Sequence, residues 1–186
     1  PHAEIIHVDV DPASISKNVE VDVPIVGDVK AVLGEMNEVT DKLGTGEAGR
    51  LDDWWAQIRE WRSRDCLAYD QDAERIKPQF VVEKIYEVTR GEAIICTEVG
   101  QNQMWAAQFY RFQKPRRFLS SGGLGTMGYG FPAAIGAQLG NPGALVFDVA
   151  GDGSFQMNVQ ELATAVQNAL PVNVAILNNR FLGMVR

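Results

Sequence analysis

The sequence predicts an α/β protein in which a parallel sheet carries helices on both faces, preceded by the tail of a second α/β domain. The main observation is the stretch 144–179, which is typical of a strand, a tight turn, a helix and a second strand. The strands expected at 144–149 and 172–177 are short apolar runs, as in sheets buried on both faces. Between them, apolar residues recur at helical spacing over 157–169. This βαβ pattern makes the two strands parallel.

Composition limits the possible classes of function. The chain has 186 residues, 46% of them hydrophobic, and a formal net charge of −7, which argues against a nucleic-acid partner. No apolar run approaches the ~18 residues of a membrane span and the start has no signal-peptide pattern, so we expect no membrane partner and a cytoplasmic protein. Cys66 and Cys96 are expected to be reduced thiols, with Cys96 buried and inert. Because the chain starts at Pro1, we also expect a segment of a longer protein.

Three regions are expected along the chain. Residues 1–44 are interpreted as the end of an α/β domain, with a strand at 4–10, a helical piece at 13–17 and an extended run at 19–26. An amphipathic helix over 29–43 follows, with Asp28 as its N-cap and Gly44 as its C-cap.

Residues 45–77 are expected to be a linker with one helix at 51–64. That helix is rich in tryptophan and arginine, which can stack on bases, but acidic residues lie among them and favour a helix that packs across a domain boundary.

Residues 78–186 are expected to form the domain that holds the site. Pro78 suits the start of a helix over 79–90, which leads to a strand at 93–97. A short strand at 118–121 and a helix of small residues at 133–139 precede the βαβ unit.

The two strands of the βαβ unit end in Asp152 and Asn179, which we expect side by side at the carboxyl edge of the sheet. A carboxylate, an amide oxygen and a main-chain carbonyl just beyond are ligands that Mg²⁺ accepts while it keeps diphosphate oxygens and water. Gly151 and Gly153 let the backbone approach a ligand closely. The alternative is an ordinary βαβ unit in which these are turn residues.

The spacing GDG, then 24 residues, then NN resembles the diphosphate–Mg²⁺ motif of thiamine diphosphate enzymes. The resemblance implies a thiamine diphosphate-binding fold for residues 78–186 and a magnesium ion held by Asp152, Asn179 and the backbone carbonyl of Phe181. It also implies cofactor contacts from neighbouring residues of the same stretch, namely Gly151, Gly153, Ser154, Phe181 and Met184.

A second stretch, VGQNQMW at 99–105, follows the strand expected at 93–97. It is similar to the VGQHQMW of acetohydroxyacid synthases, in which the glutamine and histidine point at the cofactor diphosphate. The implied cofactor residues are Val99, Gly100, Gln101 and Asn102. Asn102 replaces the usual histidine and cannot carry positive charge, which weakens the implication at that position alone. The alternative is a plain helix N-cap.

The glycine-rich stretch 122–130 opens a helix after a strand but lacks the GxGxxG spacing of a dinucleotide site. It resembles SSGGLGTMGYGFPAAIGA of the same synthases. There the methionine, Met127 here, lies between the two rings of the cofactor and holds it bent, with Gly125 in the same loop. Met127 is the one residue of this chain to which the resemblance assigns a catalytic role.

The start of the chain, HVDVDPASISKNVEVDVPIVGDVKAVL, resembles the end of the central FAD-binding domain of these synthases. By that resemblance Asp9 and Val10 lie near an FAD adenosine. A carboxylate at a strand end can accept hydrogen bonds from a ribose, but Asp9 could equally cap a turn. His7 is interpreted as a packed strand residue rather than a ligand.

Together the three stretches identify the chain as a member of the acetohydroxyacid synthases, also called acetolactate synthases. The resemblance implies a transferase that decarboxylates pyruvate and joins the two-carbon unit to pyruvate or 2-oxobutyrate, in valine, leucine and isoleucine biosynthesis. It implies catalytic subunits in homodimers or tetramers with a regulatory small subunit, and an activating glutamate in another domain, so the segment alone is expected to be inactive. The alternatives are a sibling enzyme (pyruvate oxidase, glyoxylate carboligase or sulfoacetaldehyde acetyltransferase) and a non-catalytic module of the same fold.

Overall fold

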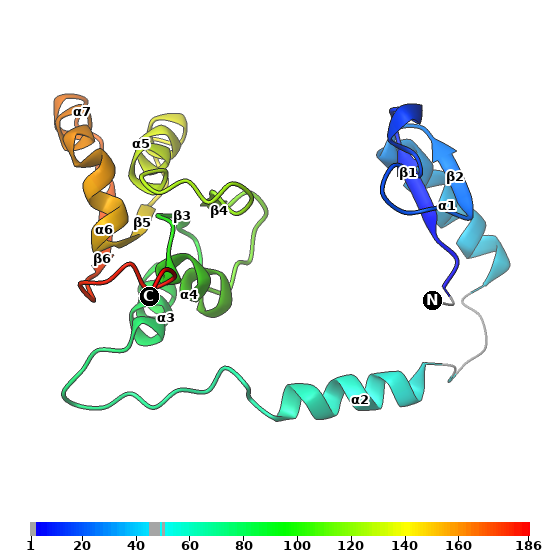
Figure 1. The fold of residues 1–186 in the computed structure, drawn as a ribbon, viewed down its shortest axis with the longest axis horizontal. Coiled ribbons are helices and arrows are strands. Elements are labelled where there is room, and N and C mark those ends of the chain that lie inside the picture. The colour runs from blue at the N-terminus through cyan, green and yellow to red at the C-terminus, as the bar shows by residue number, and fades with distance from the viewer. Residues whose placement is uncertain (1–2, 45–48, 50) are drawn as a thin grey trace. The chain divides into compact units, whose positions relative to one another are not determined.

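The fold is that of a computed structural model, which describes residues 3–44, 49 and 51–186. Contacts divide the chain into two compact units, of which unit 1 runs to Ala68 and unit 2 runs from Tyr69 to Arg186. Each unit is described by itself below (Figure 1). Of the small polar stretch expected to open the linker at 45–49, only Gly49 lies within the described residues.

Unit 1 begins with a two-stranded parallel sheet. Strand β1 (Ile6–Asp9) pairs with β2 (Val23–Val26), and a 3₁₀ turn, η1 (Pro12–Ser14), follows β1. Both strands are shorter than the extended runs expected from the sequence. Helix α1 (Val29–Leu43) has the bounds that the sequence predicts, because local capping sets them. The Asp28 carboxylate accepts the backbone N–H groups of the first turn, and Gly44 ends the helix with a φ of 80°.

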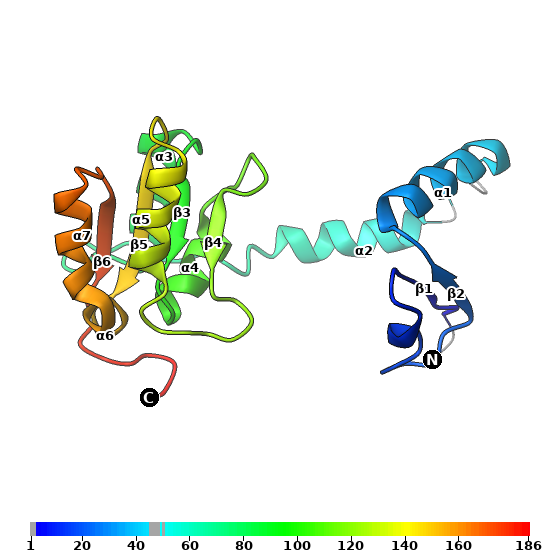
Figure 2. The ribbon, with the colours of Figure 1, turned by 90° about the horizontal axis from the view of Figure 1, so that it is seen from above.

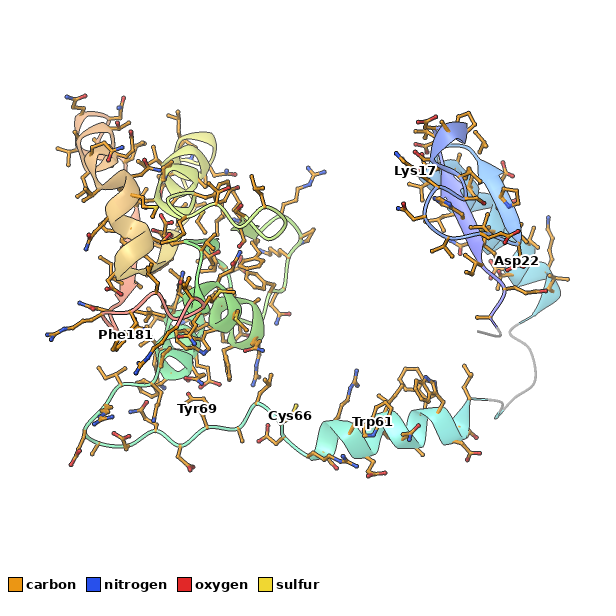
Figure 3. The ribbon with its side chains drawn as sticks, viewed as in Figure 1. Lys17, Asp22, Trp61, Cys66, Tyr69 and Phe181 are labelled. Carbon is orange, nitrogen blue, oxygen red and sulfur yellow. The ribbon has the colours of Figure 1, made fainter. Side chains whose placement is uncertain are left out.

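Helix α2 (Asp52–Ser63) confirms the helix expected at 51–64. Trp61, labelled in Figure 3, lies edge-to-face on Trp54, with 5.6 Å between the ring centroids. No hydrophobic side chain among the described residues of unit 1 is buried, so the core of the described structure lies in unit 2.

Unit 2 is built on a parallel sheet with the strand order β4-β3-β5-β6. Its strands are β3 (Ile94–Thr97), β4 (Phe118–Ser120), β5 (Val146–Gly151) and β6 (Asn173–Leu177). All three pairings are parallel, so the four carboxyl ends meet at one edge of the sheet. This arrangement confirms the predicted fold class.

Helices cover both faces of this sheet (Figures 1 and 2). Helices α3 (Pro78–Thr89) and α4 (Gln101–Phe109) lie on one face, and α5 (Gly130–Gly140) and α7 (Leu162–Gln167) lie on the other. Within β3, Ile95 packs in the first layer while Ile94 and Cys96 pack in the second. Burial on both faces explains why the strands are continuous apolar runs. Across the described part of the chain, no helix has the length and apolar character that a membrane span needs.

The helix predicted at 157–169 is wrong in its start and its continuity. Helix α6 (Asp152–Phe155) begins directly after β5, and a 3₁₀ segment, η2 (Gln156–Glu161), separates it from α7. The break is at Asn158, which has a non-helical φ of −130° and donates its side-chain N–H to the Gly128 carbonyl oxygen at 2.6 Å. A side chain bonded to a separate loop thus holds the backbone out of helical geometry.

Candidate functional site

A cavity of about 330 Å³ lies at the carboxyl edge of the unit 2 sheet. It is walled by the ends of β3, β5 and β6, by the loop before α5 and by the segment that follows β6. Phe181, labelled in Figure 3, lies in that last segment. Every residue that the sequence predicts to contact thiamine diphosphate or its metal lines this one cavity: Val99, Gly100, Gln101, Asn102, Gly125, Met127, Gly151, Asp152, Gly153, Ser154, Asn179, Phe181 and Met184.

The pairing of β5 with β6 brings the two expected metal ligands to neighbouring strand ends. Gly151 is the partner of Leu177, so Asp152 follows directly on one strand and Asn179 two residues beyond the other. The Asn179 side-chain oxygen accepts the backbone N–H of Phe181 at 2.9 Å, which holds this turn in shape. The adjacency inferred from the βαβ pattern is therefore present in the structure.

Asp152 is the only acidic residue among the described residues that line the cavity, and no lysine or arginine lies among them. Likewise, no group of three or more His, Cys, Asp or Glu side chains that could hold a metal occurs in the part of the chain that the structure describes. A cation held here would depend on one carboxylate, on neutral oxygens and on oxygens of its own ligand. That donor set fits Mg²⁺ bound together with a diphosphate, since no cationic side chain of the lining neutralises the anion.

Asn102 is buried, with 4% of its surface exposed. Its side-chain nitrogen donates to the carbonyl oxygens of Glu98 at 2.9 Å and Val149 at 2.8 Å, and so links the ends of β3 and β5. Both amide hydrogens are used within the protein, which leaves the side-chain oxygen, an acceptor, on the side of Gly100 and Gly151. Asn102 thus forms part of the cavity wall, and the donor that the resemblance suggests for a diphosphate is engaged elsewhere.

Met127 is partly buried at the cavity, in a loop held on both sides. Before it, the Thr126 backbone N–H donates to the Ser121 hydroxyl at 3.0 Å. After it, Gly128 has a φ of 83°, which favours glycine, and its N–H donates to the Glu98 carboxylate at 2.8 Å and to the Ser154 hydroxyl at 3.1 Å. The position of Met127 is therefore set by the backbone of its neighbours.

Two acidic side chains, Glu98 and Asp148, lie beneath this loop with none of their surface exposed. The Glu98 carboxylate accepts hydrogen bonds from three groups, whereas neither oxygen of Asp148 has a partner among the described residues. Burial, and then the charge of Glu98, raises the pKa of Asp148 to about 8. Cys96 is buried, as expected, and burial, and then Asp148, raises the pKa of its thiol to about 12.

Sequence reasoning missed several residues of the site. Trp105 lines the cavity one helical turn after Gln101, a spacing that could have revealed it. Leu177 is the last residue of β6, while Leu182, Gly183 and Val185 extend the segment after Asn179. Glu98 stands directly before the VGQNQMW stretch, but no local signal connects it to a loop 30 residues away.

In unit 1, the Asp9 side chain caps the turn that follows β1, which is one of the two roles expected from the sequence. One carboxylate oxygen accepts the Asp11 backbone N–H at 2.9 Å, and the other lies 4.0 Å from His7 Nε2. Val10 is 68% exposed, and His7 is half-buried in β1. Contact of Asp9 and Val10 with an FAD adenosine stays a prediction.

Comparison with known proteins relates both units to one kind of enzyme. Residues 98–186 match the family described as thiamine pyrophosphate enzyme, C-terminal TPP binding domain, and residues 1–36 match thiamine pyrophosphate enzyme, central domain. The chain is 52% identical over its whole length to the acetolactate synthase isozyme 3 large subunit of Escherichia coli K12, and 50% identical to the acetolactate synthase large subunit of Haemophilus influenzae. It is also 51% identical, over 98% of its length, to the chloroplastic acetolactate synthase 2 of Brassica napus.

The chain covers 33% of the E. coli relative, 32% of the H. influenzae relative and 28% of the B. napus relative, so it spans about one third of their length. The similarity is continuous across both units, and the cavity is built by residues within the matched C-terminal domain. The chain therefore belongs to the thiamine pyrophosphate enzymes, in the branch of the acetolactate synthase large subunits.

Proposed function

We propose that this chain is part of the catalytic subunit of an acetolactate synthase, a transferase that decarboxylates pyruvate and transfers the two-carbon unit to pyruvate or 2-oxobutyrate. The observation that carries the proposal is the convergence of three distant stretches, 99–102, 125–127 and 151–154, with Asn179 on one cavity at the carboxyl edge of the sheet. The names of the relatives supply the reaction, which belongs to branched-chain amino-acid biosynthesis.

In this proposal the cavity binds the diphosphate end of thiamine diphosphate through Mg²⁺. Asp152, Asn179 and the Phe181 carbonyl hold the metal, which offsets the charge that the lining leaves uncompensated. The remaining lining residues form the walls that exclude water from the cofactor. Bound thiamine diphosphate supplies a reactive ring carbon and an electron sink for decarboxylation. Met127, which lines the cavity, would contact the bound cofactor and hold it in the bent form that the resemblance implies.

The proposal extends beyond the cavity, to unit 1 and to parts of the enzyme outside this chain. FAD would contact Asp9 and Val10, where one carboxylate oxygen of Asp9 has no backbone partner within the described part of the chain. Homodimers or tetramers with a regulatory small subunit, and a cytoplasmic location, belong to the same proposal. So do domain boundaries after residues 44 and 77, and an activating glutamate from another domain.

The test is Asp152→Ala in the full-length enzyme, titrated calorimetrically with thiamine diphosphate and Mg²⁺. We expect metal-dependent binding to be lost, because the Asp152 carboxylate is the one charged side chain among the described residues that line the cavity. Asp70→Ala, which removes an exposed carboxylate outside the cavity, is the matched control and should bind as the parent does. Unchanged affinity in Asp152→Ala would contradict the proposal.

A further inference from the structure

We propose that Glu98 is a positioning residue: its buried carboxylate ties the loop that carries Met127 to Ser154 in the short helix α6, and so holds Met127 at the cavity. The inference rests on the proposed function in one respect, namely that Met127 contacts the cofactor. The anchoring itself follows from the described residues alone.

Glu98 follows strand β3 and binds two segments that are distant in sequence. One oxygen, Oε2, accepts the Gly128 backbone N–H at 2.8 Å and the Ser154 hydroxyl at 2.6 Å. The other, Oε1, accepts the Phe131 backbone N–H at 2.9 Å. The Ser154 hydroxyl also accepts from Gly128 N–H at 3.1 Å and from Val99 N–H at 3.4 Å, which closes a network between the three segments.

A carboxylate with 0% of its surface exposed is costly unless hydrogen bonds replace its water. Glu98 receives three, two of them from backbone groups where helix α5 begins. The opening N–H groups of a helix have no partner within the helix and favour negative charge. A negatively charged side chain is therefore favoured at position 98. An apolar side chain of the same size would leave the groups that donate to Glu98 buried with fewer acceptors.

Glu98 acts on Met127 through the backbone. The Met127 thioether is only a weak hydrogen-bond acceptor, so it cannot hold the side chain in place by itself. The Gly128 N–H belongs to the peptide group that joins Met127 to Gly128, so its bond to Glu98 sets the orientation of that group. Asn158 donates to the carbonyl oxygen of Gly128 at 2.6 Å and holds the next peptide group. Without Glu98, the remaining acceptor for the Gly128 N–H is the Ser154 hydroxyl, which itself donates to Glu98.

Asp148 provides a matched control. It is as deeply buried as Glu98 and lies on the neighbouring strand, opposite Cys96, but among the described residues its carboxyl group makes no hydrogen bond to the loop that carries Met127 or to Ser154. Asp148→Asn therefore changes a buried carboxyl group without removing an anchor of the loop. A change in the Met127 signal that occurs in Glu98→Gln and not in Asp148→Asn therefore reports the loss of the anchor and not the loss of a buried charge.

The experiment uses the full-length protein labelled with [methyl-¹³C]methionine, with the Met127 signal assigned by its loss in Met127→Leu. Glu98→Gln keeps the size of the side chain and one acceptor oxygen. It replaces the other oxygen with an NH₂ group, which cannot accept the hydrogen bonds that the carboxylate accepts. We expect the Met127 methyl resonance to shift or broaden in Glu98→Gln and to stay unchanged in Asp148→Asn. With thiamine diphosphate and Mg²⁺, we expect hydrogen–deuterium exchange at the reactive carbon of the cofactor to slow about 10- to 100-fold, while affinity changes less than about threefold.

A Met127 methyl resonance that stays in place in Glu98→Gln overturns the proposal. A shifted resonance with an unchanged exchange rate would instead contradict the proposed contact between Met127 and the cofactor. If Glu98→Gln does not fold, Glu98→Asp replaces it, because it keeps the carboxylate but shortens the side chain by one methylene group and so withdraws the acceptor from the Gly128 N–H; an unmoved methyl there also overturns the proposal. If the parent protein binds no thiamine diphosphate, the proposed function fails, whereas the methyl comparison without cofactor still decides whether Glu98 positions Met127.

Discussion

Replacing Gly130 with alanine should separate helix α5 from the centre of the sheet. A Cβ atom at this position would lie 2.4 Å from the Glu98 backbone nitrogen, 2.5 Å from the Thr97 carbonyl carbon and 2.5 Å from Asp148 Oδ1. Two of these atoms are backbone at the end of β3, so they cannot move aside without moving the strand. Glycine is needed here for close approach and not for a positive φ.

The expected cost is that of overpacking, about 1–3 kcal/mol. Gly136 on the same helix is the matched control, because a Cβ there would meet nothing within 4 Å. Alanine in a helix is favoured over glycine by about 0.5–1 kcal/mol, so Gly136→Ala should be neutral or stabilising. The two substitutions add the same methyl group to one helix and should act in opposite directions.

Hydrogen–deuterium exchange of the full-length protein, followed by mass spectrometry, measures this locally and does not require the whole protein to unfold in one step. In peptides that cover 93–98 and 130–140, we expect exchange to be roughly 5- to 150-fold faster in Gly130→Ala, as the free-energy cost implies. Gly136→Ala should exchange as slowly as the parent or more slowly. Equal protection of both variants would refute the argument from close approach.

Three further results are expected. Met127→Ala should slow hydrogen–deuterium exchange at the reactive carbon of thiamine diphosphate about 100-fold while calorimetric affinity stays the same; a parallel loss of affinity would make Met127 a core residue only. The pKa of Asp148 is raised from 3.8 to about 8, so its contribution to stability is present below pH 3.8 and is lost as the pH rises to about 8. Urea unfolding at pH 6 and 8 should show this loss in the parent and not in Asp148→Asn, and an identical loss in both would exclude Asp148 as its source. Alkylation of the native protein should label the exposed Cys66 (Figure 3) and spare Cys96 until unfolding, and early labelling of Cys96 would contradict its burial.

The features that sequence reasoning predicted well depend on short-range physics. The Asp28 cap accepts N–H groups two and three residues ahead, so the start of α1 could be read directly. Strands β5 and β6 are largely apolar because side chains on both of their faces pack against helices, although Ile176 of β6 is 46% exposed, and that pattern needs no knowledge of the partner. Once those strands are parallel, their ends must share an edge, which placed Asp152 and Asn179 together.

The sequence by itself therefore determined the parallel α/β architecture and most of the residues that meet at the cavity. Only the tertiary structure decided how those residues are held. The break at Asn158 depends on a carbonyl 30 residues away, and the donors of Asn102 reach a strand 47 residues away. Glu98 and Ser154 are 56 residues apart. A buried polar side chain must find a partner, but its residue type does not specify which distant group that partner is, because only the packing of the helices and loops against the sheet brings the two together.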